Sequence, residues 1–226
     1  MMRWLKRATI PSWYPIPRKT KKYLVVPRGS HKKEESIALL PLVRDIFKLA
    51  ETSAEARKVI KGGDIEVDGR KRKDIHHAIG AFDIIAIPKI GKYWRAIPKN
   101  GLSFVEIGED ESKLKIVKVR DRRVLRGKKT QINLSDGRNI LSDKECSSGD
   151  SLLLQLPEQK IVDHLKLDKG AAVMILSGKM QGGICKIDTI EKNNSRAWVH
   201  TGKERFEVPL DKLVVVGKEK PLIKLE

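Results

Sequence analysis

The sequence predicts an α+β protein that is mostly β, because helical patterns are confined to one short stretch and strand patterns fill most of the rest. Apolar residues recur at helical spacing between residues 37 and 61. After Pro88, short segments of β-type residues alternate with turn signals such as Asn100-Gly101, and no long helical pattern interrupts them. Hydrophobic residues make up 40% of the chain, so a folded core is expected.

The charge of the chain is strongly positive and unevenly spread. Its 226 residues include 47 Lys and Arg against 29 Asp and Glu, which gives a net charge of +18 and indicates a polyanionic partner. Residues 1–33 hold ten basic side chains and no acidic one, whereas residues 34–89 hold ten of each. More than half of the excess charge therefore belongs to the first 33 residues.

The cysteine content and the hydropathy exclude several classes of protein. Cys146 and Cys185 are too few for a disulfide framework or a Cys-rich zinc ribbon, and neither belongs to a Cys-x-x-Cys pair, so a reducing, cytoplasmic setting is expected. No apolar segment approaches the ~18 residues of a membrane-spanning helix, and residues 1–13 lack the apolar core of a signal peptide. We expect no membrane partner and no secretion.

Residues 1–36 are expected to form a basic N-terminal arm. Four prolines break any helix there, and four aromatic residues are interleaved with the basic side chains, namely Trp4, Trp13, Tyr14 and Tyr23. Basic tails are often solvated, but Trp and Tyr suit a purely solvating tail poorly, whereas their rings can stack on unpaired bases. These features favour an arm that becomes ordered on folded RNA over a tail that stays solvated.

Residues 37–88 are predicted to form a small module of two helices and a hairpin. Apolar spacing predicts an amphipathic helix over residues 37–50. Thr52 and Glu55 have the spacing of a capping box, in which both side chains satisfy free backbone N–H groups at the start of a helix. The Gly-Gly pair that follows Lys61 would end this second helix.

A hairpin is predicted directly after the second helix. Asp68-Gly69 is a strong hairpin signal because both residues tolerate positive φ. Basic residues lie on the predicted solvent side of the second helix and on the strand that returns from the hairpin. The phosphate-binding residues predicted for this module are Arg44, Arg57, Lys58, Lys61, Arg70, Lys71, Arg72 and Lys73.

Residues 89–168 are predicted to form a β-rich central domain. Within it, residues 113–129 hold nine basic side chains and a single acid, Asp121. Apolar residues partly alternate with Lys at the start of this segment, as in a strand with one buried and one basic face. Such a charge run is usually a solvated surface, but an excess of nine to one favours a strand that faces phosphates.

Residues 169–226 are predicted to form a separate C-terminal β domain. Five short segments of β-type residues are separated by tight turns, which suits a small barrel.

Two motifs resemble those of known RNA-binding proteins. The first lies at the centre of the predicted helix-hairpin module and reads SAEARKVIKGGDIEVDGRKRKDI. It resembles the small RNA-binding module of a bacterial small-subunit ribosomal protein, pseudouridine synthases and tyrosyl-tRNA synthetases. The second reads GAAVMILSGKMQGGICKIDTI and resembles the KOW motif of ribosomal and transcription-elongation proteins, which implies an SH3-like barrel.

The KOW resemblance has one departure. Cys185 stands where the motif normally has its characteristic glycine. Two outcomes are open: either Cys185 adopts a special backbone conformation, or the turn is relaxed and Gly182 and Gly183 supply the conformational freedom.

The order of the parts resembles the e-type protein-four family of the archaeal and eukaryotic small ribosomal subunit, over essentially the whole chain. This resemblance implies a structural constituent of the small subunit, located in the cytoplasm within the ribosome. It implies that the protein binds small-subunit ribosomal RNA through backbone contacts, lies beside neighbouring small-subunit proteins and supports assembly and translation. The alternative is a non-ribosomal, KOW-containing RNA-binding transcription or translation factor.

The sequence contains no constellation that indicates an enzyme. Its five histidines lack metal-ligand spacing, and no phosphate-binding loop motif occurs. We therefore expect no catalytic residue, no metal, no cofactor and no small-molecule substrate. The phosphate-binding residues predicted outside the helix-hairpin module are Arg18, Lys19, Lys21, Lys22 and Arg28 in the arm, and Lys113, Lys115, Lys118, Arg120, Arg122, Arg123, Arg126, Lys128 and Lys129 in the central segment.

Overall fold

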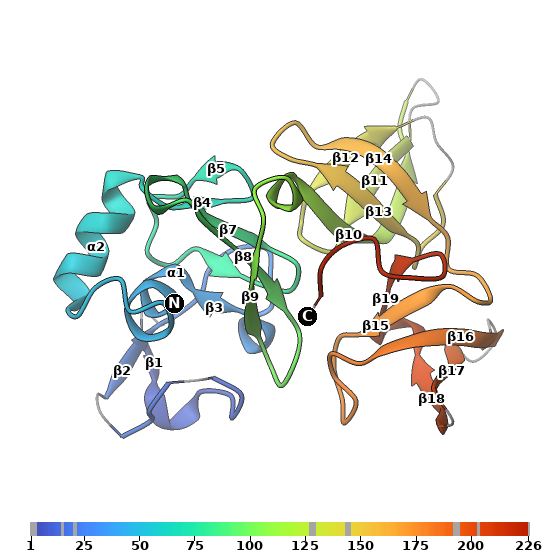
Figure 1. Ribbon diagram of the computed structural model, residues 1–226, viewed down its shortest axis with the longest axis horizontal. Coiled ribbons are helices and arrows are strands. Elements are labelled where there is room, and N and C mark those ends of the chain that lie inside the picture. Colours follow the sequence, from blue (N-terminus) through green and yellow to red (C-terminus); the bar gives the residue numbers. More distant parts are fainter. Residues whose placement is uncertain are drawn as a thin grey trace. The chain divides into compact units, whose positions relative to one another are not determined.

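The computed structural model divides the chain into two compact units (Figure 1). Unit 1 comprises Met1–Ala96 and Asn100–Ser112, and unit 2 comprises Ile97–Lys99 and Lys113–Glu226. The four domains drawn from the sequence divide the chain more finely and stay a prediction. The structure describes residues 4–14, 16–19, 22–126, 130–142, 146–191, 195–202 and 204–225.

Unit 1 combines short strands with one regular helix. Its strands are β1 Trp4–Lys6, β2 Tyr23–Val25, β3 Ile37–Ala38, β4 Glu66–Val67, β5 Arg70–Lys71, β6 Ala78–Ile79, β7 Ile84–Ile87, β8 Lys92–Ile97 and β9 Ser103–Ile107. Its helices and helical turns are η1 Arg7–Thr9, η2 Lys33–Glu35, α1 Leu39–Pro41, η3 Leu42–Ile46, α2 Ser53–Gly62, η4 Pro88–Ile90 and η5 Glu111–Lys113. One sheet has the order β5-β4-β7-β8-β9, and the pairs β1-β2 and β3-β6 stand apart from it.

The helix predicted over residues 37–50 is wrong as a regular α-helix. The segment begins as strand β3, and α1 and the π-helical turn η3 follow it. The N–H groups of Leu39 and Leu40 donate to the carbonyls of His77 and Ile75, so they are bonded outside the segment. Apolar residues on several sides of this segment are buried, which explains why tertiary contacts override the helical pattern.

The second helix and the hairpin are confirmed. The Thr52 hydroxyl accepts from the Glu55 N–H at 3.2 Å while the Glu55 carboxylate accepts from the Thr52 N–H, which completes the capping box. Gly63 ends α2 with φ of 78°. Asp68 and Gly69 have φ of 53° and 70°, as the tight turn between β4 and β5 requires.

The N-terminal segment folds onto unit 1 as a part of its core. β1 pairs with β2, and Tyr14 and Leu24 belong to the same buried cluster as Ile37 and Ile60. The Tyr14 hydroxyl donates to the Ser36 carbonyl. Burial raises the pKa of this hydroxyl. Tyr14 is therefore a core residue, and the expected role of its ring in stacking on RNA bases is not supported.

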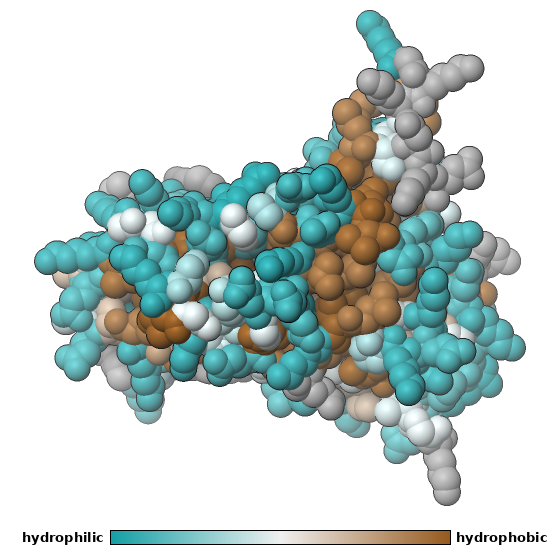
Figure 2. All heavy atoms as spheres, turned by 45° about the horizontal axis from the view of Figure 1, so that its top comes forward, coloured by the Kyte–Doolittle hydropathy of each residue, from teal (hydrophilic) through white to brown (hydrophobic). Residues whose placement is uncertain are grey.

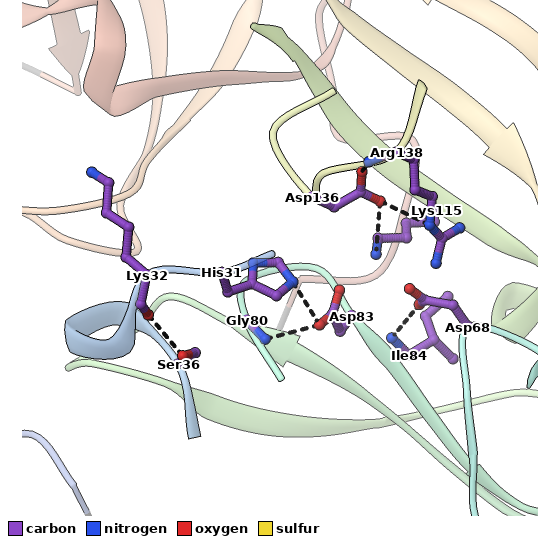
Figure 3. Close-up of polar contacts among 10 residues, drawn as sticks. All are labelled: His31, Lys32, Ser36, Asp68, Gly80, Asp83, Ile84, Lys115, Asp136 and Arg138. Atoms are coloured by element: carbon purple, nitrogen blue, oxygen red, sulfur yellow. Dashed lines mark hydrogen bonds and ion pairs between the residues drawn. The ribbon is translucent and has the colours of Figure 1, made fainter. Parts of the chain in front are cut away.

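A contact between an imidazole and a carboxylate joins the N-terminal segment to the turn before β7. His31 Nε2 lies 2.9 Å from Asp83 Oδ2, and the same carboxylate accepts from the Gly80 N–H at 2.8 Å (Figure 3). A Cβ atom built on Gly80 would lie 2.3 Å from the His31 ring, so only glycine permits this close packing.

Unit 2 consists of two five-stranded antiparallel sheets. The first contains β10 Leu114–Val124, β11 Thr130–Leu134, β12 Asn139–Ser142, β13 Ser151–Gln155 and β14 Lys160–Leu165, in the order β12-β11-β10-β13-β14. The second contains β15 Ala172–Ile175, β16 Ile184–Glu191, β17 Arg196–Thr201, β18 Glu204–Pro209 and β19 Leu213–Gly217, in the order β18-β17-β16-β15-β19, with the turn η6 Leu210–Lys212 before β19. The predicted α+β class with a majority of β structure is confirmed, although β12 and β14 were not anticipated from the sequence.

Cys185 takes an ordinary strand position in the second sheet. It pairs with Val173 across β15 and β16, and its side chain is buried. Its Sγ lies 2.8 Å from Thr201 Oγ1, and burial raises the pKa of the thiol. Gly182 has a positive φ of 81°, whereas Cys185 does not have a positive φ. The turn before β16 is therefore relaxed, and Gly182 supplies its conformational freedom.

Candidate nucleic-acid interface

The solvent side of α2 carries three basic side chains. Ala56 and Ile60 are fully buried on the opposite side, which fixes the rotation of the helix. Arg57, Lys58 and Lys61 are consequently all exposed. The sequence pattern predicted this arrangement, and the structure places the three side chains as expected.

The strand that returns from the hairpin brings further lysines to the end of α2. A Cβ atom built on Gly63 would lie 3.5 Å from Lys73 Cε and 3.9 Å from Lys71 Cδ, so both side chains lie over the C-terminus of the helix. The free carbonyls there carry partial negative charge, which favours nearby cations. We call the exposed set the α2–hairpin surface, and its members are Arg57, Lys58, Lys61, Arg70, Lys71 and Lys73.

Arg44 and Arg72 do not belong to this exposed set. The Arg44 guanidinium donates to both carboxylate oxygens of Asp45, at 2.8 and 2.7 Å, and to the Ser53 hydroxyl at 2.5 Å. Its side chain is only 8% exposed, and the hydrogen bond with Asp45 raises its pKa. Arg72 is half-buried beside His77, whose pKa is lowered by burial and by the charge of Arg72.

The basic residues of the N-terminal segment remain exposed although the segment is folded. Arg18, Lys19, Lys22 and Arg28 all face solvent, whereas Lys21 lies outside the described residues. The Lys22 ammonium lies 5.4 Å from the ring centroid of Tyr23, which is itself 49% exposed. The N-terminal segment therefore presents four exposed cations.

The sequence predicted that this strand has one buried face and one basic face. Lys115 and Lys118 do not fit that prediction, because both faces of the first half of β10 are covered. Lys115 shares a face with Val117 and Val119 of the buried core, is 1% exposed, and places Nζ 3.4 Å from Asp136 Oδ2 (Figure 3). Lys118 points to the other face, where Nζ donates to the carbonyls of Leu210 and Asp211 at 2.7 and 3.0 Å. Burial lowers the pKa of Lys118 to about 8. Both ammonium groups therefore bond within unit 2 instead of facing solvent.

The second half of β10 projects beyond this core. A register shift between Val119 and Asp121 leaves Arg120 as an extra residue, and such a bulge redirects a strand. All residues from Arg120 to Arg126 are exposed, as is Lys113 at the start of the segment. Lys128 and Lys129 lie outside the described residues.

Apolar side chains accompany these arginines on the surface of the first sheet. Figure 2 shows hydrophobic residues gathered on one part of a mainly hydrophilic face. The exposed large hydrophobic residues of this sheet and its loops are Val124, Leu125, Leu141 and Val162.

Three lysines that the sequence did not single out surround a cavity in unit 2. Lys166, Lys169 and Lys218 line this cavity together with His164 and Val215. No charge run marks them, since about fifty residues separate the last lysine from the other two. Only the folded chain brings them together.

Neither a metal site nor a membrane-spanning helix is found among the described residues. No group of three or more His, Cys, Asp or Glu side chains is arranged to hold a metal ion in that part of the chain. No helix among the same residues is long and apolar enough to cross a membrane.

Comparison with known proteins gives matches along nearly the whole chain. The model of ribosomal family S4e matches residues 90–161. The small ribosomal subunit protein eS4 of Korarchaeum cryptofilum (strain OPF8) is 39% identical over 227 aligned residues, which cover 99% of this chain and 97% of the relative. The protein of the same name from Archaeoglobus fulgidus is 40% identical and covers 97% of both chains.

A solved structure is similar as well. The crystal structure of the 30S ribosomal protein S4e from Thermoplasma acidophilum superposes with a TM-score of 0.71 at 26% sequence identity. The match covers 85% of this chain and 99% of that protein.

Proposed function

The chain belongs to ribosomal family S4e, and on this premise we propose that it is a structural constituent of the small ribosomal subunit that binds small-subunit ribosomal RNA through its phosphates. In this role it supports assembly of the subunit and translation in the cytoplasm. Its partners are the RNA and neighbouring small-subunit proteins.

The α2–hairpin surface carries this proposal. It presents six exposed cations from two adjacent elements, although residues 34–89 are neutral overall. Charges placed on one surface attract a phosphate backbone even where the net charge of the region is zero. Lys and Arg contacts to phosphates position a protein on RNA without reading its bases, which is the behaviour that a structural subunit protein needs.

The projecting part of β10 and the N-terminal segment supply two further basic surfaces. Arg122 and Arg123 lie at the exposed end of β10, and Arg18 and Lys19 lie on the N-terminal segment. A protein with several separate basic surfaces can neutralise phosphates on more than one RNA helix. This property suits a protein that holds parts of a large folded RNA together.

The salt dependence of RNA binding tests the proposal. Contacts with about six phosphates predict that log affinity falls against log salt with a slope of about −4 to −5. Binding of the full chain to small-subunit ribosomal RNA, measured by filter retention between low and moderate salt, gives this slope directly. A slope near zero would contradict binding through phosphates.

A second measurement separates a ribosomal constituent from a free translation or transcription factor. A constituent remains in small subunits at one copy each after a high-salt wash, because assembled contacts are numerous and enclosed. Substoichiometric, salt-labile association would favour the free factor.

A further inference from the structure

A small cavity lies between β2 and the start of α2 in unit 1. Its volume is about 80 Å³, and we call it the β2–α2 cavity. The apolar side chains that line it, Leu24, Val25 and Leu40, are each at most 3% exposed and offer a ligand almost no surface. The polar lining comes from Tyr23, Arg44, Ser53 and Arg57. Any binding in this cavity therefore depends on those four side chains.

The core of unit 1 holds the walls of the cavity in place. Leu24, Val25 and Leu40 belong to one buried cluster, which also contains Ala56 and Ile60 of α2. β2 pairs with β1 along its whole length, and the capping box fixes the first turn of α2. The polar side chains of the cavity thus project from elements that the core orients.

Arg44 keeps part of its hydrogen-bonding capacity for a ligand. A guanidinium group has five N–H donors. Three of those in Arg44 donate to the two carboxylate oxygens of Asp45 and to the Ser53 hydroxyl. The other two have no acceptor among the described residues. Because the Arg44 side chain is only 8% exposed, an anion would meet these donors at a fixed position.

Ser53 and Arg57 add donors from the first turns of α2. The Ser53 hydroxyl accepts from Arg44, and its own O–H has no acceptor in the part of the chain that the structure describes. Arg57 is exposed and makes no hydrogen bond or ion pair with any described residue through its side chain. A spacing of four residues puts the two side chains on one side of the helix, whereas Glu55, between them, lies on the other side.

The charge around the cavity favours an anion. Among the described residues, no acidic side chain lines it. Asp45, which pairs with Arg44, also lies 3.7 Å from the guanidinium group of Arg7. Two arginines therefore share one carboxylate, and Arg57 adds a further positive charge. The start of a helix attracts an anion as well.

An exposed aromatic ring belongs to the same cavity. Tyr23 lines it and is 49% exposed, although the two residues after it in β2 are buried. The Lys22 ammonium lies 5.4 Å from the centroid of this ring. Exposed aromatic rings among cations stack on unpaired bases, and every base has an aromatic face for such stacking.

We propose that the β2–α2 cavity binds one unpaired nucleotide of an RNA strand, with the phosphate on its Arg and Ser side chains and the base stacked on Tyr23. Cavities that enclose whole small molecules measure about 300–1,000 Å³, so this one admits a phosphate group and leaves the base outside, against the ring. Tyr23 itself lines the cavity, so the phosphate and the base can belong to the same nucleotide. A paired base is already stacked on its neighbours in the duplex, so only an unpaired one is available to the ring.

This inference rests on the proposed function for its RNA partner and adds a contact with a base. The α2–hairpin surface holds phosphates only, whereas the β2–α2 cavity distinguishes an unpaired nucleotide from a paired one. Arg57 belongs to both sites, but Tyr23 belongs to the cavity alone. Variants of Tyr23 therefore test the cavity separately.

Fluorescence anisotropy of labelled RNA strands with the full-length protein tests the proposal. The probes are a short oligoadenylate and an abasic strand of the same length, which has the same sugars and phosphates but no bases. The oligoadenylate is expected to bind about fivefold or more tightly than the abasic strand, because its bases can stack on the ring. Adenosine 5′-monophosphate is expected to compete far more weakly than unlabelled oligoadenylate, because it carries a single phosphate.

Variants of Tyr23 assign the preference for bases to the ring. Tyr23→Leu keeps an apolar side chain without the ring, and it should reduce the preference to below about twofold. Tyr23→Phe, which keeps the ring, is the matched control and should retain the preference. Both substitutions are at an exposed position, so the fold should tolerate them.

A variant of Arg57 tests the phosphate side of the site. Arg57→Gln is expected to weaken the oligoadenylate and the abasic strand alike, by about fivefold, because it removes charge-assisted hydrogen bonds to the phosphate. Lys186→Gln makes the same change in charge at an exposed position of β16 in unit 2, and an effect below about twofold is expected there.

Equal affinity for the two strands, while both bind, would overturn the inference and leave the proposed function intact. An unchanged preference in Tyr23→Leu or an unchanged affinity in Arg57→Gln would overturn it too. Competition by the monophosphate as strong as that by the unlabelled strand would identify a free nucleotide as the ligand and would also overturn it. If neither strand bound and small-subunit ribosomal RNA did not bind either, the proposed function would be contradicted as well.

Discussion

α2 and the first half of β10 both carry lysines among apolar residues, yet the structure uses these lysines in opposite ways. On α2, one side packs against the core and the cations of the other side remain in solvent. On β10, one face meets the buried core of the first sheet and the other meets the turn before β19, so Lys115 and Lys118 bond within the protein. The number of elements that cover a segment decides whether its cations are free to bind a partner.

Removal of the buried lysine gives the largest expected effect. Lys115→Ala removes one of the cations beside the Asp136 carboxylate, whose side chain is only 5% exposed. Loss of one partner of a buried ion pair costs about 3 kcal/mol of unfolding free energy. Arg138, 3.3 Å from the same carboxylate, limits the loss. Urea denaturation measures the change. An unchanged unfolding free energy would mean that Lys115 is not a structural residue.

Charge reversal on α2 tests whether its exposed cations bind RNA. Arg57→Glu with Lys58→Glu is expected to weaken binding to small-subunit ribosomal RNA by about 10- to 100-fold at low salt, because two phosphate contacts become repulsive. The unfolding free energy should change little, since both side chains are exposed. Lys160→Glu with Lys186→Glu serves as the control of equal charge. The same loss of affinity in the control would show that only net charge matters.

The pH dependence of stability tests the burial of the Lys118 ammonium. Burial lowers the pKa of Lys118 in the folded protein to about 8, below the usual 10.5. Between these two values the unfolded chain binds more protons, so the contribution of this group to stability rises with pH, by at most about 1.4 kcal/mol per pH unit. Below pH 8 both states are protonated and this contribution is constant.

Lys118→Met supplies the reference for that measurement, because it lacks the titrating group while other lysines and tyrosines titrate as before. The difference in unfolding free energy between the original protein and the variant should grow from pH 8 to pH 10 in favour of the original protein. A constant difference would contradict burial of this ammonium.

Loss of the helix cap gives the smallest expected effect. Thr52→Ala removes the hydroxyl that accepts from Glu55 and should lower the unfolding free energy by about 1 kcal/mol. RNA affinity should fall less than about twofold, because the cations of α2 remain exposed. Thr52→Ser, which keeps a hydroxyl, is the matched control. If Thr52→Ala lowered RNA affinity as much as Arg57→Glu with Lys58→Glu, the cap would do more than hold the start of the helix.

The sequence predicted those parts of the fold in which local signals and packing agree. The capping box at Thr52 and Glu55 and the turn at Asp68-Gly69 have short-range causes, and both are confirmed. The segment after Ser36 has a helical pattern, but its backbone bonds to residues almost forty positions away, which no local pattern contains. The pairing of β1 with β2 was also missed, because each of these strands has only three residues.

The exposed cations of the candidate interface were predictable only where an apolar pattern in the sequence shows which side of an element is buried. The exposed cations of α2 follow from the burial of Ala56 and Ile60, whereas Arg44 is held by its neighbour Asp45. The positions of Lys115 and Lys118 depend on Asp136 and on the turn before β19, both distant in sequence. The bulge that exposes the residues after Val119 also has no local signal.

Lysine reactivity in the free protein and in assembled small subunits distinguishes cations that bind RNA from cations that are bonded within the protein. Brief acetylation followed by mass spectrometry reports each lysine separately. We expect that Lys58, Lys61, Lys71 and Lys73 react in the free protein and become protected in the subunit, whereas Lys115 is unreactive in both. Equal reactivity of the α2–hairpin lysines in the two states, or a Lys115 that reacts when free and is protected on assembly, would contradict it.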